Sequence, residues 1–245
     1  MTILISKEKL MGFKSLEELW VLTSESFSDR ILSYEEIHYI LFLCRGIWHY
    51  QNPEKPTADF PHARIGDICF DGYAQIDKAL AYNRLRHIFT DQLYRMLRND
   101  HRSLHIDRVI TSNSATSIMH AGQDICRMIG KGCQLGTTKI DETGAAVWDG
   151  KMTKAAYVLQ LGRQIFDLTE DRKALRAVNP DQSFAPVSLV MTHMGPMTSL
   201  EGVPFITLLH MPNVRTYPSS ECPYCKVGSP THDPRFSQGW FNLKG

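Results

Sequence analysis

Hydrophobic residues recur at helical spacing in three separate stretches of the chain. The first follows Ser33, which forms a capping box with the glutamate three residues later. The second covers 83–99, and the third runs from Ile118 to a stop at Gly130. The pattern predicts three helices that each bury one face, and a further helix is expected at 168–178.

Short apolar runs with the length of buried strands lie between these helices. They cover 105–110, 133–138, 156–161, 186–192 and 204–209. Strands that alternate with helices are typical of an α/β domain with a largely parallel central sheet flanked by helices. Residues 1–32 are expected to add one or two short helices packed on this domain. The proline-rich stretch at 51–61 predicts a loop, and the tail from Cys222 onward is expected to wrap the surface.

Composition and charge narrow the class of protein only in part. Hydrophobic residues make up 43% of the 245 residues, which is enough for a substantial core. The net charge of +1 neither selects nor excludes a polyanionic partner such as nucleic acid. The first residues lack the pattern of a secretory signal, and no apolar run reaches the roughly 20 residues of a membrane span. We therefore expect a soluble, cytoplasmic protein with no membrane partner.

Two of the six cysteines, Cys222 and Cys225, stand in a Cys-Pro-Tyr-Cys motif. This spacing occurs in redox pairs of thioredoxin-like proteins and in one half of a zinc site. A zinc site would need two more ligands, and His193, His210 and His232 are candidates whose spacing does not demand the role. Three interpretations stay open, namely a structural or inert pair, which we favour, a metal site and a redox pair.

Small residues follow the predicted strand at 105–110, where the next helix begins. They are Ser112, Asn113, Ser114, Ala115 and Thr116. Backbone amides at the start of a helix attract anions, because their N–H groups are unpaired and the helix dipole is positive there. The segment is therefore a candidate anion site, with an ordinary β–α connection capped by hydroxyls as the alternative.

The residues after the predicted strand at 156–161 do not suit a ribose-phosphate site. Such a site needs carboxylates for the ribose hydroxyls and a loop of small residues around the phosphate. Here Gly162 and Arg163 occupy the acid positions, the next three residues are bulky, and Asp167 would repel a phosphate. Asp167 and Glu170 are instead predicted to form a capping pair for the helix that follows.

The order of these segments resembles the orotate phosphoribosyltransferase family, especially a divergent bacterial branch. The matching stretches are Ile47-Trp48-His49-Tyr50, Phe70-Asp71-Gly72-Tyr73 with the helix after it, the strand–turn–helix at 107–130, Thr138-Lys139, the strand at 158–160 and the tail at 220–230. The resemblance implies a type I phosphoribosyltransferase fold, with a parallel sheet, a small hood and a tendency to dimerise. The family-like domain would cover 33–245, with its hood at about 33–75 plus the tail, and 1–32 would be an N-terminal helical extension.

The resemblance also implies a site for phosphoribosyl pyrophosphate (PRPP), orotate and Mg²⁺. By position, 112–115 would form the pyrophosphate loop, Lys139 would contact the pyrophosphate, and 140–154, with Lys154, would be a mobile catalytic loop. The base would bind near 66–73. The residues of this segment that match the family are Phe70, Asp71, Gly72 and Tyr73.

The departures from the family fall on the residues that should hold the ligands. The paired acids and the small-residue loop are missing at 162–167. The family's Ser-Gly-x-Lys-Ser pattern near the base is replaced at 66–70 by a segment without lysine. Our first hypothesis is therefore a phosphoribosyltransferase-like protein without PRPP-dependent catalysis or a cofactor. It would act as a homo-oligomer or as a binding or assembly subunit with a protein or nucleic-acid partner.

The alternative hypothesis is an active orotate-type phosphoribosyltransferase or nucleotide-processing enzyme that uses Mg²⁺ at a relocated site. Its acids would be Asp167, Glu170 and Asp171, and its anion clamp would be Lys139 and Lys154. We favour the first hypothesis, because catalysis depends on holding PRPP against the incoming base. The segments that should bind these two ligands, 162–167 and 66–70, both differ from the family pattern.

Overall fold

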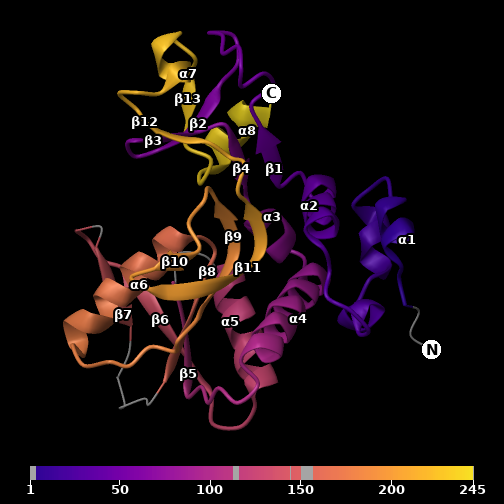
Figure 1. Cartoon of the computed structure of the whole chain (residues 1–245), viewed down its shortest axis with the longest axis vertical. Helices are drawn as coiled ribbons and strands as arrows, with labels where there is room; N and C mark the ends of the chain where they lie inside the picture. The colour runs from indigo at the N-terminus through magenta and orange to yellow at the C-terminus, as the bar shows by residue number, and fades with distance from the viewer. Residues whose placement is uncertain (1–3, 113–115, 144, 150–156, 245) are drawn as a thin grey trace.

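The computed structural model of the chain describes residues 4–112, 116–143, 145–149 and 157–244. These residues form a seven-stranded central sheet with the order β10-β11-β9-β8-β5-β6-β7 (Figure 1). The inner strands β11, β9, β8, β5 and β6 run parallel, and β10 and β7 are antiparallel edges. The strands are β5 (Arg108–Ser112), β6 (Gln134–Ile140), β7 (Ala146–Asp149), β8 (Val158–Gly162), β9 (Ser188–Met194), β10 (Ser199–Leu200) and β11 (Val203–Met211).

Helices cover the two faces of this sheet. Helix α5 (Thr116–Ile129) connects β5 to β6, and α6 (Ile165–Val178) connects β8 to β9 in the opposite direction across the sheet. Because such crossovers are right-handed, the two helices lie on opposite faces. Helix α4 (Asn83–Asp100) packs beside α5, where the buried pair Arg86–Asp124 joins them at 3.0 Å. The predicted α/β fold with a mostly parallel sheet is confirmed.

The predicted elements of the core are confirmed with small shifts of their ends. Strands β5, β8 and β9 are buried along their whole length, as expected for parallel strands covered on both faces. The strand expected at 105–110 begins later, and the helix expected at 168–178 begins three residues earlier. Helix α5 ends before Gly130, whose φ of +112° is a backbone conformation that favours glycine.

A second sheet and a neighbouring pair of strands, which together we call the hood, combine segments that are far apart in the sequence. Its strand order is β12-β3-β2-β13, and β1 pairs with β4 beside it. In Figure 1 the hood lies above the central sheet. Its strands are β1 (Ile47–His49), β2 (His62–Ile65), β3 (Ile68–Phe70), β4 (Gly72–Ala74), β12 (Thr216–Pro218) and β13 (Thr231–His232).

The C-terminal tail is part of the hood and of the core, so the expectation that it wraps the surface is wrong. It contains α7 (Pro223–Lys226) and α8 (Ser237–Lys244). Cys222 and Tyr224 have no accessible surface, and Trp240 and Leu243 are buried. The tail's proline and glycine residues are typical of loops, and burial of its few large side chains outweighed that local preference.

The N-terminal segment packs closely against α2 and α4. It contains α1 (Lys7–Met11) and the 3-10 helices η1 (Glu17–Val21) and η2 (Ser24–Phe27), and α2 (Tyr34–Leu43) and α3 (Asp77–Leu80) follow. Leu19, Leu22 and Phe27 have no accessible surface, and the Leu32 amide donates to Gln92 Oε1 at 2.7 Å. The division of the chain at residue 32 stays a prediction. Across the described residues, no helix combines the length and hydrophobicity required to cross a membrane.

Candidate functional site

The central sheet changes its direction of growth between β5 and β8. From β5 the chain proceeds to β6 on one side, and from β8 it proceeds to β9 on the other. Ligands of open parallel sheets bind beyond the carboxyl ends of the strands at such a switch point. The candidate anion segment begins at the end of β5, and the segment with the replaced acid positions follows β8, so both lie at this edge. Of the first segment, Asn113, Ser114 and Ala115 lie outside the described residues.

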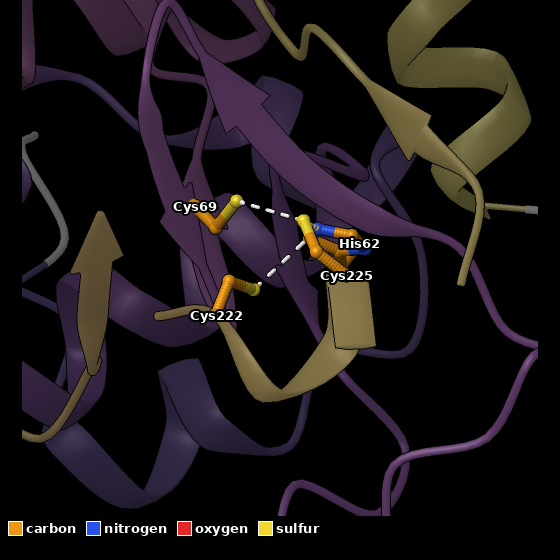
Figure 2. A group of neighbouring side chains, drawn as sticks. All are labelled: His62, Cys69, Cys222 and Cys225. Carbon is orange, nitrogen blue, oxygen red and sulfur yellow. Dashed lines mark hydrogen bonds between the residues drawn. The ribbon is translucent and has the colours of Figure 1, made fainter. Parts of the chain in front are cut away.

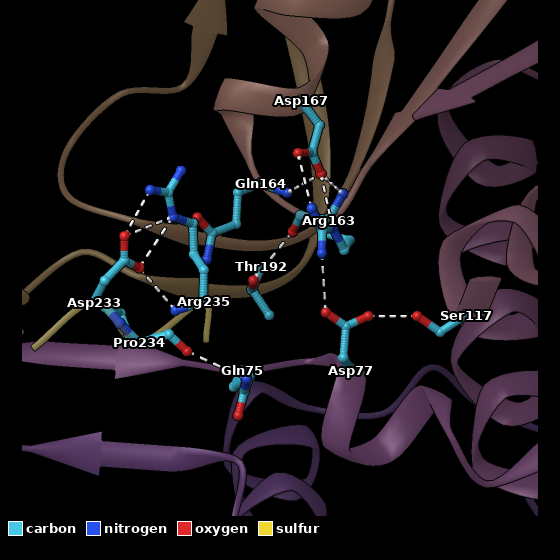
Figure 3. A network of polar contacts seen from close by, with 10 residues as sticks. All are labelled: Gln75, Asp77, Ser117, Arg163, Gln164, Asp167, Thr192, Asp233, Pro234 and Arg235. Carbon is cyan, nitrogen blue, oxygen red and sulfur yellow. Dashed lines mark hydrogen bonds and ion pairs between the residues drawn. The ribbon is translucent and has the colours of Figure 1, made fainter. Parts of the chain in front are cut away.

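Arg163, the residue after β8, joins three elements at this edge (Figure 3). Its guanidinium lies 3.2 Å from Asp77 Oδ2 on α3 and 3.2 Å from Asp167 Oδ2 on α6. The Ser117 hydroxyl on α5 donates to the other oxygen of Asp77. Burial opposes the charge of Arg163, but the carboxylates of Asp167 and Asp77 outweigh it and raise the pKa of this guanidinium.

Asp167 accepts hydrogen bonds from the two backbone amides that precede α6. Its Oδ2 accepts from the Arg163 amide at 2.8 Å and from the Gln164 amide at 3.4 Å. The predicted capping role of Asp167 is therefore confirmed, but its partner is wrong: Asp167 caps together with Gln164. Glu170 instead forms an exposed ion pair with Lys173 at 2.9 Å. A carboxylate of the chain thus occupies the amides that an anion would otherwise contact.

The backbone at Gly162 leaves no room for a side chain. A Cβ atom there would lie 2.8 Å from the carbonyl oxygen of Gln164 and 3.1 Å from a methyl group of Leu168. The tight turn between β8 and α6 therefore excludes a carboxylate at the first acid position. The second acid position holds Arg163, whose charge is opposite.

Two cavities lie near the residues expected to bind a base. A cavity of about 90 Å³ is lined by Tyr73, Arg163 and Arg235 among others. A larger one, of about 510 Å³, is lined by Asp71 and Arg215, and also by Tyr34, His49, Tyr50, Pro53 and 210–214. Asp71 is buried there, and its two oxygens accept from the Arg215 amide and Nε, each at 2.8 Å.

The remaining base candidates are buried in the hood. Phe70 and Gly72 line neither cavity, and a Cβ at Gly72 would lie 2.8 Å from His49 Nδ1. Of the segment Phe70-Asp71-Gly72-Tyr73, Asp71 lines the larger of these two cavities and Tyr73 lines the smaller. Base binding by this segment stays a prediction.

The predicted catalytic lysines and acids do not form one described cluster. Lys139 is exposed near the end of β6, one residue after Thr138, which pairs with Ser112 of β5. Lys154 lies outside the described residues. Asp171 is buried on α6, where the Thr138 hydroxyl donates to it, and burial raises the pKa of Asp171 to about 7.

Cys222 and Cys225 lie in the hood beside two residues that sequence reasoning missed as ligands, His62 and Cys69. The histidines named from the sequence are not part of this group: His193 and His210 stack on each other with ring centroids 5.2 Å apart, and His232 also lies outside it. His62 and Cys69 stand on the two strands of the β2–β3 hairpin, so recognising that hairpin would have been the signal that paired them.

Comparisons with solved structures find phosphoribosyltransferases, which is the class that the motif order indicated. The chain is similar to an orotate phosphoribosyltransferase from Mycobacterium tuberculosis, solved with inorganic phosphate (14% identity, 57% of this chain and 78% of that chain, TM-score 0.42). It is also similar to an orotate phosphoribosyltransferase from Aeropyrum pernix (14% identity, 57% and 79%, TM-score 0.45).

A third similar structure is an adenine phosphoribosyltransferase from Trypanosoma brucei (12% identity, 68% of this chain and 77% of that chain, TM-score 0.43). No model of a known protein family matches the chain, and no curated protein matches it in sequence.

Proposed function

We propose that this chain is a phosphoribosyltransferase-like protein without PRPP-dependent catalysis, and that it serves as a binding or assembly subunit. The observation that carries the proposal is the ion-pair network of Arg163 at the switch point of the sheet. Asp167 occupies the amides of the turn before α6, and Arg163 is balanced by Asp167 and Asp77.

A phosphate could enter this edge only by displacing the chain's own carboxylate. Asp167 would have to leave two backbone amides and Arg163, and a relocated carboxylate would still repel the phosphate. Each lost hydrogen bond to a charged group costs about 1.5–3 kcal/mol. The loss of the hydrogen bonds of Asp167 therefore opposes phosphate binding. The crowded backbone at Gly162 also prevents binding of the ribose hydroxyls by an acid at this position, because no acidic side chain fits there.

Titration of PRPP with Mg²⁺ into the full-length protein tests this half of the proposal. We expect no binding heat and no thermal shift at millimolar ligand. Micromolar affinity would overturn it and favour the alternative, an active transferase with Mg²⁺. In that case a panel of bases should be screened for pyrophosphate release.

A groove between the N-terminal segment, α2 and α8 supports the binding role. It has a volume of about 1010 Å³. Two of the residues that line it, Phe42 and Phe241, have side chains that are 57% and 68% exposed, respectively. The charged residues that line it are Lys14, Glu17, Arg45, Lys78 and Lys244. Four of these five are basic, so the groove complements an acidic amphipathic segment of a protein partner.

Selection of helical peptides on the full-length protein tests the groove. We expect enriched peptides to combine acidic residues with aromatic or aliphatic residues at helical spacing. Phe241→Ser should weaken their binding at least about tenfold, as expected for a central apolar anchor. The matched control is Phe236→Ser, since Phe236 is 65% exposed and lies outside the groove. Equal loss in both variants, or enrichment of peptides without acidic residues, would contradict the assigned partner.

A further inference from the structure

Four side chains of the hood converge on one point, although they come from two distant parts of the chain (Figure 2). They are His62 on β2, Cys69 on β3, and Cys222 and Cys225 at α7, and their ligand atoms all lie within 4.8 Å of one another. His62, Cys69 and Cys222 have no accessible surface, and Cys225 is half-buried. Such a set of soft ligands, removed from water, is typical of a thiolate metal site.

The distances within the group fit a tetrahedral ion. Zinc bonds of about 2.3 Å to sulfur and about 2.0 Å to nitrogen place two sulfurs about 3.8 Å apart, and a sulfur and nitrogen about 3.5 Å apart. The Cys69 and Cys225 sulfurs are 3.6 Å apart, and His62 Nε2 lies 3.3 Å from Cys225 Sγ and 3.7 Å from Cys222 Sγ. These separations are far longer than a disulfide bond of about 2.05 Å.

Hydrogen bonds on the far side of His62 set its ring for metal binding. The Ser229 hydroxyl donates its single proton to the Phe60 carbonyl at 2.6 Å, so its oxygen accepts from His62 Nδ1 at 2.8 Å. The proton of the neutral imidazole is therefore on Nδ1, and the lone pair of Nε2 faces the three sulfurs. A hydrogen bond on the outer nitrogen is the usual way in which proteins orient a ligating histidine.

The turn at α7 brings its two cysteines to the same side. Cys222 precedes the helix in an extended conformation, and Pro223 occupies the first helical position, where its fixed φ and missing N–H suit the backbone. The Lys226 amide donates to the Cys222 carbonyl at 3.2 Å, which closes the turn. Gly228 then reverses the chain with a φ of +76° and delivers Ser229 behind His62.

From this geometry we infer that His62, Cys69, Cys222 and Cys225 bind one zinc ion that fastens the C-terminal tail to the β2–β3 hairpin. Four protein ligands leave no open position, so the ion is structural rather than catalytic. The hood strands are only two to four residues long, and such small sheets commonly need a metal or a disulfide to hold them. The cavity of about 510 Å³ adjoins this part of the hood, since Arg215 in its lining directly precedes β12.

Metal analysis of the full-length protein, purified under reducing conditions without chelators, tests the inference. We expect about one zinc per chain, and metal-free reduced protein should develop the visible bands of tetrahedral thiolate-bound cobalt when Co²⁺ is added. The cobalt spectrum needs no variant, so misfolding of a mutant cannot obscure it. Reduced protein that forms no cobalt–thiolate bands would overturn the inference and leave an inert or redox pair.

Two variants with one matched control identify the ligands. Cys69→Ser should lose the zinc, whereas Cys133→Ser, which changes a partly exposed cysteine outside the group, should keep it. Ser229→Ala keeps all four ligands but removes the acceptor for His62 Nδ1, so zinc affinity should fall about 10–100-fold in competition with a chelator. Full zinc in Cys69→Ser would contradict the ligand set, and unchanged affinity in Ser229→Ala would contradict the role of the serine.

Discussion

The switch point of the central sheet and the hood differ in how their polar groups are satisfied. At the switch point, Arg163 is matched by Asp77 and Asp167 of the same chain, and the amides before α6 already have an acceptor. In the hood, the sulfurs of Cys69 and Cys225 face each other and the unprotonated nitrogen of His62. The group formed by these three residues and Cys222 contains no lysine or arginine. The first arrangement is complete by itself, whereas the second fits an added ion.

The two regions place ion pairs and potential ligand groups in different parts of one fold. The position where ligands of parallel sheets usually bind is filled by an internal ion pair, and ligand groups gather instead in a small sheet built from two distant segments. Local structure is similar in both places, because each site begins at a tight turn before a helix. The charge of the side chains at the turn makes the difference.

Removal of the hood metal should have the largest effect. We expect a chelator with a reductant to accelerate amide hydrogen exchange in β2, β3 and β12, because structural zinc sites contribute on the order of 10 kcal/mol to folding and the hood is small. Exchange in β5 and β9 should change little, since both are buried in the central sheet. Equal acceleration in all five strands would mean that the hood does not fold as a separate unit.

Asp171 should give the switch-point edge a marked dependence on pH. Burial raises the pKa of Asp171 from 3.8 to about 7, so the folded protein binds this proton more tightly than the unfolded chain. Its contribution is full below pH about 4 and is lost as the pH rises through about 7, on the order of 4 kcal/mol in total. Denaturant unfolding from pH 4 to pH 8 should show a flatter profile for Asp171→Asn. Parallel profiles for the two proteins would show that Asp171 is ionised throughout.

Arg163→Met tests whether the switch point is stabilised by its internal charges. The variant leaves Asp77 and Asp167 without their shared cation, and we expect a loss of about 2–3 kcal/mol in the free energy of unfolding, less than for a fully buried pair. The double variant with Asp77→Asn should recover part of the loss in a double-mutant cycle. Additive losses would show that the two groups do not interact, and PRPP binding in either variant would contradict the role given to the crowded backbone.

Asp167 and Glu170, two of the three acids of α6, provide the smallest expected effects and a sharp contrast. Asp167→Ala removes the acceptor for the two backbone amides that precede α6 and should cost about 1–2 kcal/mol. Glu170→Ala breaks only an exposed pair with Lys173 and should change stability by less than about 0.5 kcal/mol. Thermal unfolding of the two variants side by side checks the prediction. Similar losses would indicate that Glu170 shares the capping role expected from the sequence.

Hydrophobic periodicity predicted most of the central domain. The apolar runs correspond to β5, β6, β8, β9 and β11. The signal is clearest for β5, β8 and β9, because a strand covered on both faces is apolar along its whole length. The helices at 83–99 and 118–129 were found for the related reason that a helix packed on a sheet buries one stripe. The hood strands escaped prediction because they are short. Apart from the β2–β3 hairpin, the strands of the four-stranded sheet pair across the sequence, and no local pattern encodes such pairing.

The candidate sites, like the fold, were predictable only where the residues involved are close together in the sequence. The replacement of the acid positions by Gly162 and Arg163, and the Cys-Pro-Tyr-Cys motif, were visible in the sequence because both lie within a few consecutive residues. The partners of these residues were not visible. Asp77 lies far from Arg163 along the chain, and His62 and Cys69 lie far from Cys222.

The sequence alone determined the α/β class, the core helices and strands, and the loss of the residues that a ribose-phosphate site needs. These properties depend on the order and spacing of neighbouring residues, which local backbone preferences and burial translate directly into structure. Only the tertiary structure decided that Arg163 is neutralised from α3 and that three cysteines and one histidine meet in the hood. Both depend on contacts between segments that lie far apart in the sequence and meet only in the folded protein.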